Sequence, residues 1–218
     1  MFDWPSFWES FPVLLSGLGV TVELAVVTMA GSLVVATAMA LGRLYGSRPL
    51  AMAIGAWTDI WIATPLMIQL YWLYYVMPSF VDLRLPGMLI AILGLLFNNS
   101  AFLAEVFRSA IASIRDGQWY AARALGMSET RAFMRVIAPQ AFSRALPATA
   151  NIWVELFKNT SIVSTVAVTD ITFKALELRN DTFRTLEVLS ALALIYLALG
   201  YPQAKLADWL YSRIKVRE

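Results

Sequence analysis

Apolar residues gather in long blocks along the chain, separated by shorter polar segments. Four blocks approach or exceed the roughly 20 apolar residues that cross a bilayer as a helix: residues 11–42, 50–77, 87–104 and 188–206. Another block, residues 145–157, is the fourth along the chain; it is shorter and interrupted by polar residues. Residues 161–168 are apolar but too short to span alone. The pattern predicts an all-α membrane protein with about five transmembrane helices, the fourth of them sheltered inside the bundle.

The composition supports a membrane protein and excludes several other classes. Hydrophobic residues make up 59% of the 218 residues and charged residues only 15%, so the apolar surface exceeds what a soluble core can bury. The chain has no His, no Cys and no Gly-Lys dipeptide, which excludes a disulfide scaffold, cysteine–zinc sites and a P-loop. We therefore expect no catalytic residues, no metal site and no cofactor, and a net charge of +2 gives no reason to expect nucleic acid.

The basic residues indicate how the chain lies in the membrane. Twelve of the 17 Lys and Arg residues fall in segments that share one side: Arg43, Arg48, Arg108, Arg115, Arg123, Arg131, Arg135, Arg144, Lys205, Arg213, Lys215 and Arg217. Loops rich in Lys and Arg stay in the cytoplasm, so we expect the N-terminus outside and the C-terminus inside. The first ten residues carry acidic and no basic residues, which is typical of mature sequence rather than a signal peptide.

The segment between the third and fourth blocks, residues 113–145, is basic and helical in composition. Residues 118–125 predict a short helix that ends at Gly126, and Ser128 can cap a second helix. Phe133, Val136 and Ile137 form one apolar stripe on that second helix, which we expect Pro139 to end. Such an elbow is either a docking element for another protein or an amphipathic loop on anionic lipid.

The elbow carries a sequence motif. The spacing Tyr120-Ala121-Ala122-x3-Gly126-x9-Val136-Ile137-Ala138-Pro139 resembles the EAA loop of ABC-importer permeases. Residues 64–70, 98–105 and 158–164 also resemble permeases of the polar amino acid uptake family. Residues 158–161 followed by 164–170 look most like permeases for acidic amino acids. The chain departs from the pattern at Tyr120, which stands where the motif has glutamate, and at Ile62-Ala63, where many relatives have Arg-Gly.

This resemblance implies a function and a set of partners. It implies one transmembrane permease domain over residues 1–218 of an ATP-driven amino acid importer in the bacterial inner membrane, working by alternating access. Two cytoplasmic ATP-binding cassette ATPase subunits would hold the elbows, a second permease subunit would complete a dimer, and an extracytoplasmic binding protein would deliver substrate. The expected coupling residues are Tyr120, Ala121, Ala122, Arg123, Gly126, Ser128 and Pro139. Alternatives are an ion-coupled secondary transporter or channel, and a membrane scaffold that transports nothing.

Polar residues inside the blocks are candidates for the substrate pathway, because a charged side chain at membrane depth costs about 2.5–3.5 kcal/mol. The candidates are Glu23, Asn98, Asn99, Glu105, Asn151, Glu155, Lys158, Asn159 and Thr160. Glu155 and Lys158 could bind the ammonium and carboxylate of an amino acid, or they could pair with each other. Glu105 could equally pair with Arg108 one turn on.

Two breaks are also expected within these blocks. Pro65 should kink the second block and free backbone carbonyls that Thr64 or Gln69 can satisfy. The stretch 158–164 is expected to be a broken helix, since irregular backbone is tolerated at membrane depth where it lines a cavity.

Overall fold

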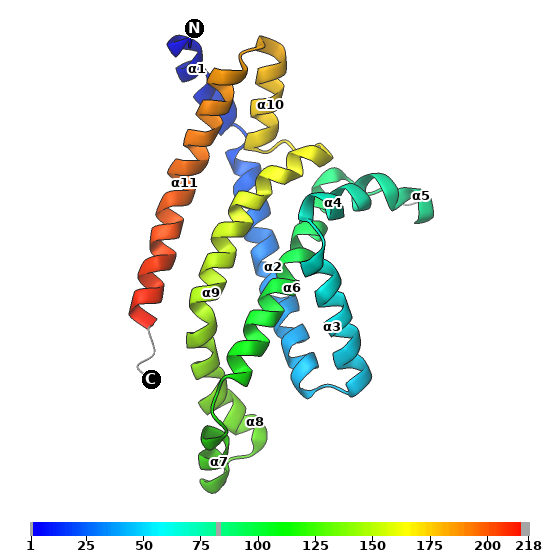
Figure 1. Cartoon of the computed structure of the whole chain (residues 1–218), viewed down its shortest axis with the longest axis vertical. Coiled ribbons are helices and arrows are strands. Elements are labelled where there is room, and N and C mark those ends of the chain that lie inside the picture. Colours follow the sequence, from blue (N-terminus) through cyan, green and yellow to red (C-terminus); the bar gives the residue numbers. More distant parts are fainter. Residues whose placement is uncertain (1, 82–83, 215–218) are drawn as a thin grey trace.

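The computed structural model describes residues 2–81 and 84–214, and the regular elements within those ranges are all helical. Four long helices run along the bundle: α2 (Leu18–Tyr45), α6 (Gly87–Ala112), α9 (Ala138–Asn159) and α11 (Thr185–Ile214). At one end α1 (Trp4–Leu15) and α10 (Ile171–Thr182) pack beside the start of α11, and at the other end α7 (Asp116–Ala124) and α8 (Glu129–Ala132) project from the bundle (Figure 1). We call this second end the elbow end. The predicted all-α fold is confirmed.

Three of the helices, α2, α6 and α11, are long and apolar enough to cross a membrane among the described residues. A bent pair over residues 48–81 makes a fourth candidate if it counts as one span. The helix α9 is long enough to cross a membrane but is not among these candidates, because one of its faces is polar. The count of five spans therefore remains a prediction. The structure does show several helices that can cross a membrane, packed in one bundle.

The second apolar block is bent, as Pro65 predicts, and the bend is much larger than a kink. The helix α3 (Arg48–Ala63) ends at Thr64, and the arm that follows, made of α4 (Leu66–Tyr71), the π-helix η1 (Trp72–Val76) and α5 (Pro78–Val81), turns by 105°. In Figure 1 the arm extends sideways at the end opposite the elbow. Thr64 and Gln69 both donate to carbonyls freed at the bend, as expected from the sequence.

The main core lies where α2 and α6 meet the end of α9 and the segment that follows it, residues 160–168. The helices α2 and α6 have the most extensive contact of any two elements described, with Gly31 lying against the Leu96 side chain. After Asn159 the helix α9 tightens into the 3-10 helix η3 (Thr160–Val166), so the α-helix ends within the predicted stretch 158–164, although the chain stays helical until Ala167, whose φ is 59°. Gly17 and Gly87 allow this segment to approach closely, since an added Cβ would lie 2.5 Å from Asp170 or 2.3 Å from the Val166 carbonyl.

One expectation about the elbow is wrong. Pro139 does not end the second elbow helix; it lies in the first turn of α9, directly after the π-helix η2 (Phe133–Ile137). Proline has no N–H to donate to the preceding turn, and the widened π turn directly before it accommodates the ring, so the chain passes from α8 into α9 without a stop.

Candidate functional site

The first elbow helix ends in a tight left-handed turn at Gly126. Gly126 has φ of 73°, its N–H donates to the Arg123 carbonyl at 2.9 Å, and the Met127 N–H donates to the Ala122 carbonyl at 3.1 Å. These two bonds form a Schellman motif, which uses glycine because a Cβ is unfavourable at positive φ. The end of α7 at Gly126 is as the sequence predicts.

The second elbow helix also begins as predicted. The Ser128 side chain accepts a hydrogen bond from the Arg131 N–H at 3.4 Å, which caps α8. Arg123 on α7 pairs with Glu129 on α8 at 3.2 Å, so the two short helices are joined across the turn. Both side chains are largely exposed, so the pair orients the elbow and contributes little stability.

The elbow is packed onto the bundle through a small apolar core. Ile114 and Ile137 are buried with Ala110, Ala141 and Ala145, while the predicted stripe residues Phe133 and Val136 pack around them. Arg144 of α9 donates to the Ser113 carbonyl at 2.6 Å and so caps the end of α6. The elbow therefore has a fixed place at the ends of α6 and α9.

The outer surface of the elbow is apolar at its tip. Leu125 is 77% exposed and Tyr120 is 65% exposed, although Ala122 behind them is buried. A groove of about 630 Å³ runs between the elbow and the last turn of α2, with Tyr45 and Phe133 meeting edge to face at its wall. Exposed apolar side chains beside a groove, on a segment otherwise rich in arginine, are typical of a protein contact surface.

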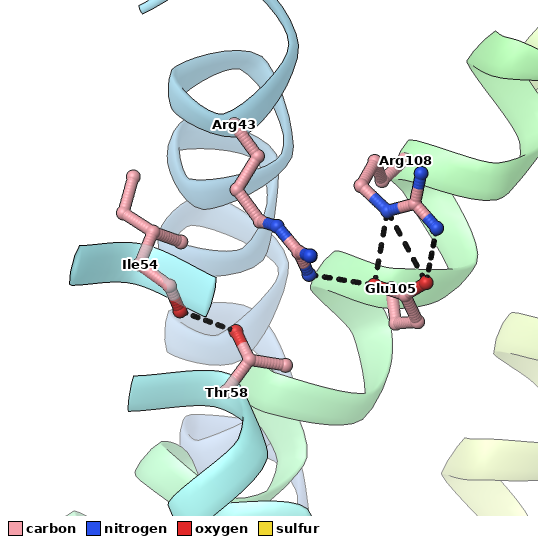
Figure 2. Close-up of polar contacts among 5 residues, drawn as sticks. All are labelled: Arg43, Ile54, Thr58, Glu105 and Arg108. Carbon is pink, nitrogen blue, oxygen red and sulfur yellow. Dashed lines mark hydrogen bonds and ion pairs between the residues drawn. The ribbon is translucent and has the colours of Figure 1, made fainter. Parts of the chain in front are cut away.

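An ion cluster lies on the bundle just inside the elbow end. Glu105 of α6 accepts from Arg43 of α2, whose Nη1 lies 2.8 Å from Oε2, and also pairs with Arg108 one turn along α6. Figure 2 shows the carboxylate between the two guanidinium groups, with Thr58 of α3 nearby donating to the Ile54 carbonyl at 2.8 Å. The predicted Glu105–Arg108 pair is confirmed, and Arg43 extends it into a tie between two helices.

The tie predicts unequal effects for the two arginines. Arg43→Ala removes the bond between helices and should destabilise the protein by about 1–2 kcal/mol, since charged hydrogen bonds contribute about that much when partly screened. Arg108→Ala removes only a bond within α6 and should cost about 0.3–0.5 kcal/mol. Thermal unfolding in detergent should show the midpoint lower by about 2–8 °C for Arg43→Ala. Equal midpoints for the two variants would contradict the tie.

The polar stripe predicted on α9 lies on one exposed face. Asn151, Glu155 and Lys158 are exposed, and together with Asn159 they line an open groove of about 480 Å³ whose other wall includes Asp208 of α11. Among the ion pairs of the described residues, none joins Glu155 to Lys158. Both charged groups are therefore available to a ligand or to a second subunit in this structure.

The remaining pathway candidates are placed differently. Asn98 is buried and its amide donates to Gln69 and to the Trp61 carbonyl, while Asn99 is buried with no hydrogen-bond partner for its amide nitrogen. Thr160 is fully buried and donates to the Phe157 carbonyl at 2.7 Å. Glu23 is exposed on α2 and does not belong to the α9 groove. The structure thus gathers four of the nine candidates in one groove.

Asp170 is a buried acid that the sequence does not single out. It precedes α10, where its Oδ1 accepts from the Phe173 N–H at 2.8 Å, and its Oδ2 is buried without a hydrogen-bond partner. The carboxyl lies outside the long apolar helices, and burial raises its pKa to about 6 although hydrogen bonds from Phe173 and Thr172 oppose the shift. An N-cap aspartate alone gives no signal of such burial, because elements distant in the sequence surround it: Gly17 lies against its backbone and Tyr196 of α11 lies beside its carboxyl.

The raised pKa makes stability depend on pH. The folded state binds this proton more tightly than the unfolded chain does, so the stability linked to it is present below about pH 4 and is lost as the pH rises through about 6, by at most about 3 kcal/mol. Asp170→Asn keeps the cap and cannot ionise. It should unfold at a higher temperature than the native protein at pH 7.5 and at a similar one at pH 4.5. The exposed Asp181→Asn on the same helix serves as the control; a native-like pH profile for Asp170→Asn would refute the assignment.

Comparison with known proteins shows which family has this sequence. Residues 32–216 match the model described as "binding-protein-dependent transport system inner membrane component". The chain is 31% identical over 99% of its length, and 99% of the relative's, to the glutamine transport system permease protein GlnP of Escherichia coli (strain K12). It is 33% identical to the octopine transport system permease protein OccM of Rhizobium radiobacter, covering 94% of this chain and 87% of that one.

A solved structure agrees with these relatives. The fold matches a chain from the crystal structure of an amino acid ABC transporter with histidines at a TM-score of 0.90 and 29% identity, covering 98% of this chain and 99% of that one. The matched region includes the elbow, the α9 groove and the arm. The chain therefore belongs to the binding-protein-dependent transport system inner membrane components, as a permease subunit of an amino acid ABC transporter, a class of subunit that is not itself an enzyme.

Proposed function

We propose that this chain is the translocating subunit of an ATP-driven importer that moves a polar amino acid across the inner membrane by alternating access. The elbow is the observation that carries the proposal. It is fixed to α6 and α9 on one side and presents Leu125 and Tyr120 on the other. Cytoplasmic ATP-binding cassette subunits would hold this surface, and their closure on binding ATP would pull the elbow and the helices behind it.

The orientation follows from the arginine distribution. The elbow end carries the exposed Arg115, Arg123, Arg131 and Arg135, and Arg43 and Arg108 lie just inside it. Segments rich in arginine remain in the cytoplasm. The elbow end is then cytoplasmic, and the opposite end, where α1 and α10 lie, faces a substrate-delivering binding protein.

The exposed polar face of α9 supports a dimer. Lipid cannot solvate Glu155 and Lys158 without a cost of about 2.5–3.5 kcal/mol for each charge. A second permease subunit, identical or homologous, would cover this face and turn the open α9 groove into an enclosed pathway. The groove offers Glu155 to an ammonium group, Lys158 to a carboxylate and two asparagine amides to orient both.

The charge of the groove bears on the substrate. Its lining carries Glu155, Lys158 and Asp208, and Asp208 already pairs with Lys205 one turn away on α11, at 3.4 Å. Among the described residues this leaves one carboxylate, Glu155, and one ammonium, Lys158, which balance each other and favour a polar amino acid with a neutral side chain. Residues 158–161 followed by 164–170, in contrast, resemble permeases for acidic amino acids. Competition of unlabelled amino acids for uptake decides between the two.

The proposal is tested by reconstitution into liposomes with the ATPase and binding protein. Uptake should require ATP on the elbow side and should persist when ion gradients across the membrane are collapsed. Uptake that follows an ion gradient and needs no ATP would favour a secondary transporter. A complex that neither hydrolyses ATP in response to substrate nor accumulates it would favour a scaffold.

A further inference from the structure

The bend between α3 and the arm is held by side-chain amides. Pro65 has no N–H, so the carbonyl four residues earlier, that of Trp61, loses its helical donor. Gln69 Nε2 donates to this carbonyl at 2.8 Å and Asn98 Nδ2 donates to it at 3.2 Å. Two side chains, Gln69 from α4 of the arm and Asn98 from α6, thus replace one missing backbone hydrogen bond.

Gln69 and Asn98 also bind each other. Asn98 Nδ2 donates to Gln69 Oε1 at 3.1 Å, and Gln69 Nε2 lies within hydrogen-bonding distance of the Thr64 carbonyl at 3.0 Å and of Thr64 Oγ1 at 2.7 Å. Both amide side chains are only 8% exposed. In a buried setting such a network is costly to break, because each group left without a partner keeps its full desolvation penalty.

The arm is held further along its length. One turn before Asn98, Gly94 lets Leu70 of α4 lie so close that an added Cβ would be 2.5 Å from the Leu70 side chain. Tyr75 Oη donates to the Thr165 carbonyl of η3 at 3.3 Å. The arm therefore contacts α6 through Leu70 and Asn98, and contacts the continuation of α9 through Tyr75.

We propose that Gln69 and Asn98 make the bend a rigid joint, so that α3 and the arm move as one body with α6 when the transporter changes state. They are positioning residues: they touch no reacting atom in this structure but fix the arm against η3, at the outer end of the pathway. The helix α6 is unbroken from Gly87 to Ala112 and ends at the elbow. Movement of the elbow would therefore reach the arm without being absorbed at the proline break, where a hinge would otherwise be expected.

The expected effect on uptake rests on the proposed function. The expected effect on the angle between α3 and the arm does not depend on it. The chain has no native Cys, so cysteines at Met52 on α3 and Phe80 on α5, both well exposed, can carry spin labels. The 52–80 distance in the assembled transporter in lipid nanodiscs reports the angle at the bend. Each single-cysteine variant identifies distances that arise between two copies of the chain.

In the otherwise native transporter the 52–80 distance should be a single narrow population that is unchanged between the nucleotide-free and vanadate-trapped states. Gln69→Leu should broaden it, and should lower ATP-driven uptake about tenfold while ATP hydrolysis stays within about twofold. Ser100→Ala is the control, because Ser100 lies on α6 two residues after Asn98 and is fully buried, but its hydroxyl donates to the Phe97 carbonyl of the same helix and does not join the network. It should leave both the distance and the uptake within about twofold of native.

Three results would overturn the rigid joint. The native distance could change between the two nucleotide states, Gln69→Leu could leave it narrow, or Ser100→Ala could broaden it equally. If Gln69→Leu does not fold, the double variant Gln69→Leu/Asn98→Leu removes both amides together and should broaden the distance in the same way. If the chain is no ATP-driven importer, uptake fails for every variant and the native alike, while the 52–80 distance still reports the joint.

Discussion

Replacing Gly126 by glutamate should reduce ATP-driven uptake by more than tenfold while the bundle still folds. Two effects act together. A residue with a Cβ at φ of 73° costs about 1–2 kcal/mol, which weakens the turn that joins α7 to α8. The new carboxylate also lies beside Leu125, where a cleft of the ATPase would have to accept it unpaired at a cost of several kcal/mol. Uptake into liposomes and co-purification of the ATPase measure the loss.

Gly117 provides the matched control for this variant. Like Gly126, it has nothing within 4 Å of an added Cβ, but its φ is not positive. Gly117 lies in the first turn of α7, where an acidic residue is favourable to the helix dipole. Gly117→Glu should therefore keep uptake within about threefold of native. If it costs as much as Gly126→Glu, charge on the elbow and not the turn explains the effect; if neither variant loses uptake, the elbow does not couple.

Glu155→Gln should weaken transport of the native substrate roughly tenfold in half-saturating concentration. The change keeps the shape of the side chain and removes the charge that would pair with an ammonium group, an interaction that contributes about 1.5–3 kcal/mol. Initial rates of uptake over a range of substrate concentrations measure it. Because the ATPase contact is remote, the ATP hydrolysis of the empty transporter should stay near native.

Glu9→Gln, on the exposed surface of α1, controls for loss of a carboxylate elsewhere. It should leave the half-saturating concentration unchanged. A Glu155→Gln transporter with native kinetics for every polar amino acid tested would remove Glu155 from the pathway and leave the α9 face as a subunit contact alone.

Much of the elbow could be predicted from its sequence because its signals are local. Gly126 and Ser128 act on backbone groups within five residues, and their roles in the Schellman turn and the cap follow from those residue types. The prediction that Pro139 ends a helix is wrong for a related reason. Proline can end one helix or lie in the first turn of another. Which of the two occurs here depends on the π turn η2, which the residue types do not predict.

The rest of the candidate site depends on residues that are distant in the sequence. Glu105 and Arg43 are 62 positions apart, and Asn98 and Gln69 are 29 apart. The spacing within α6 indicates the pair of Glu105 with Arg108, but nothing in one sequence indicates that α2 brings a second arginine to the same carboxylate. In the same way, Asp208 joins Glu155 in one groove only because α9 and α11 pack together.

The contact between the elbow and an ATPase is tested most directly by cross-linking from position 125. Leu125→Cys introduces the one thiol of the chain at the exposed elbow tip, and a photoactivated maleimide can then be attached to the assembled transporter in membrane vesicles. We predict one main adduct, with the ATP-binding subunit, and labelling only from the cytoplasmic side. Adducts with lipid alone, or a thiol that reacts from the extracytoplasmic side, would contradict the account.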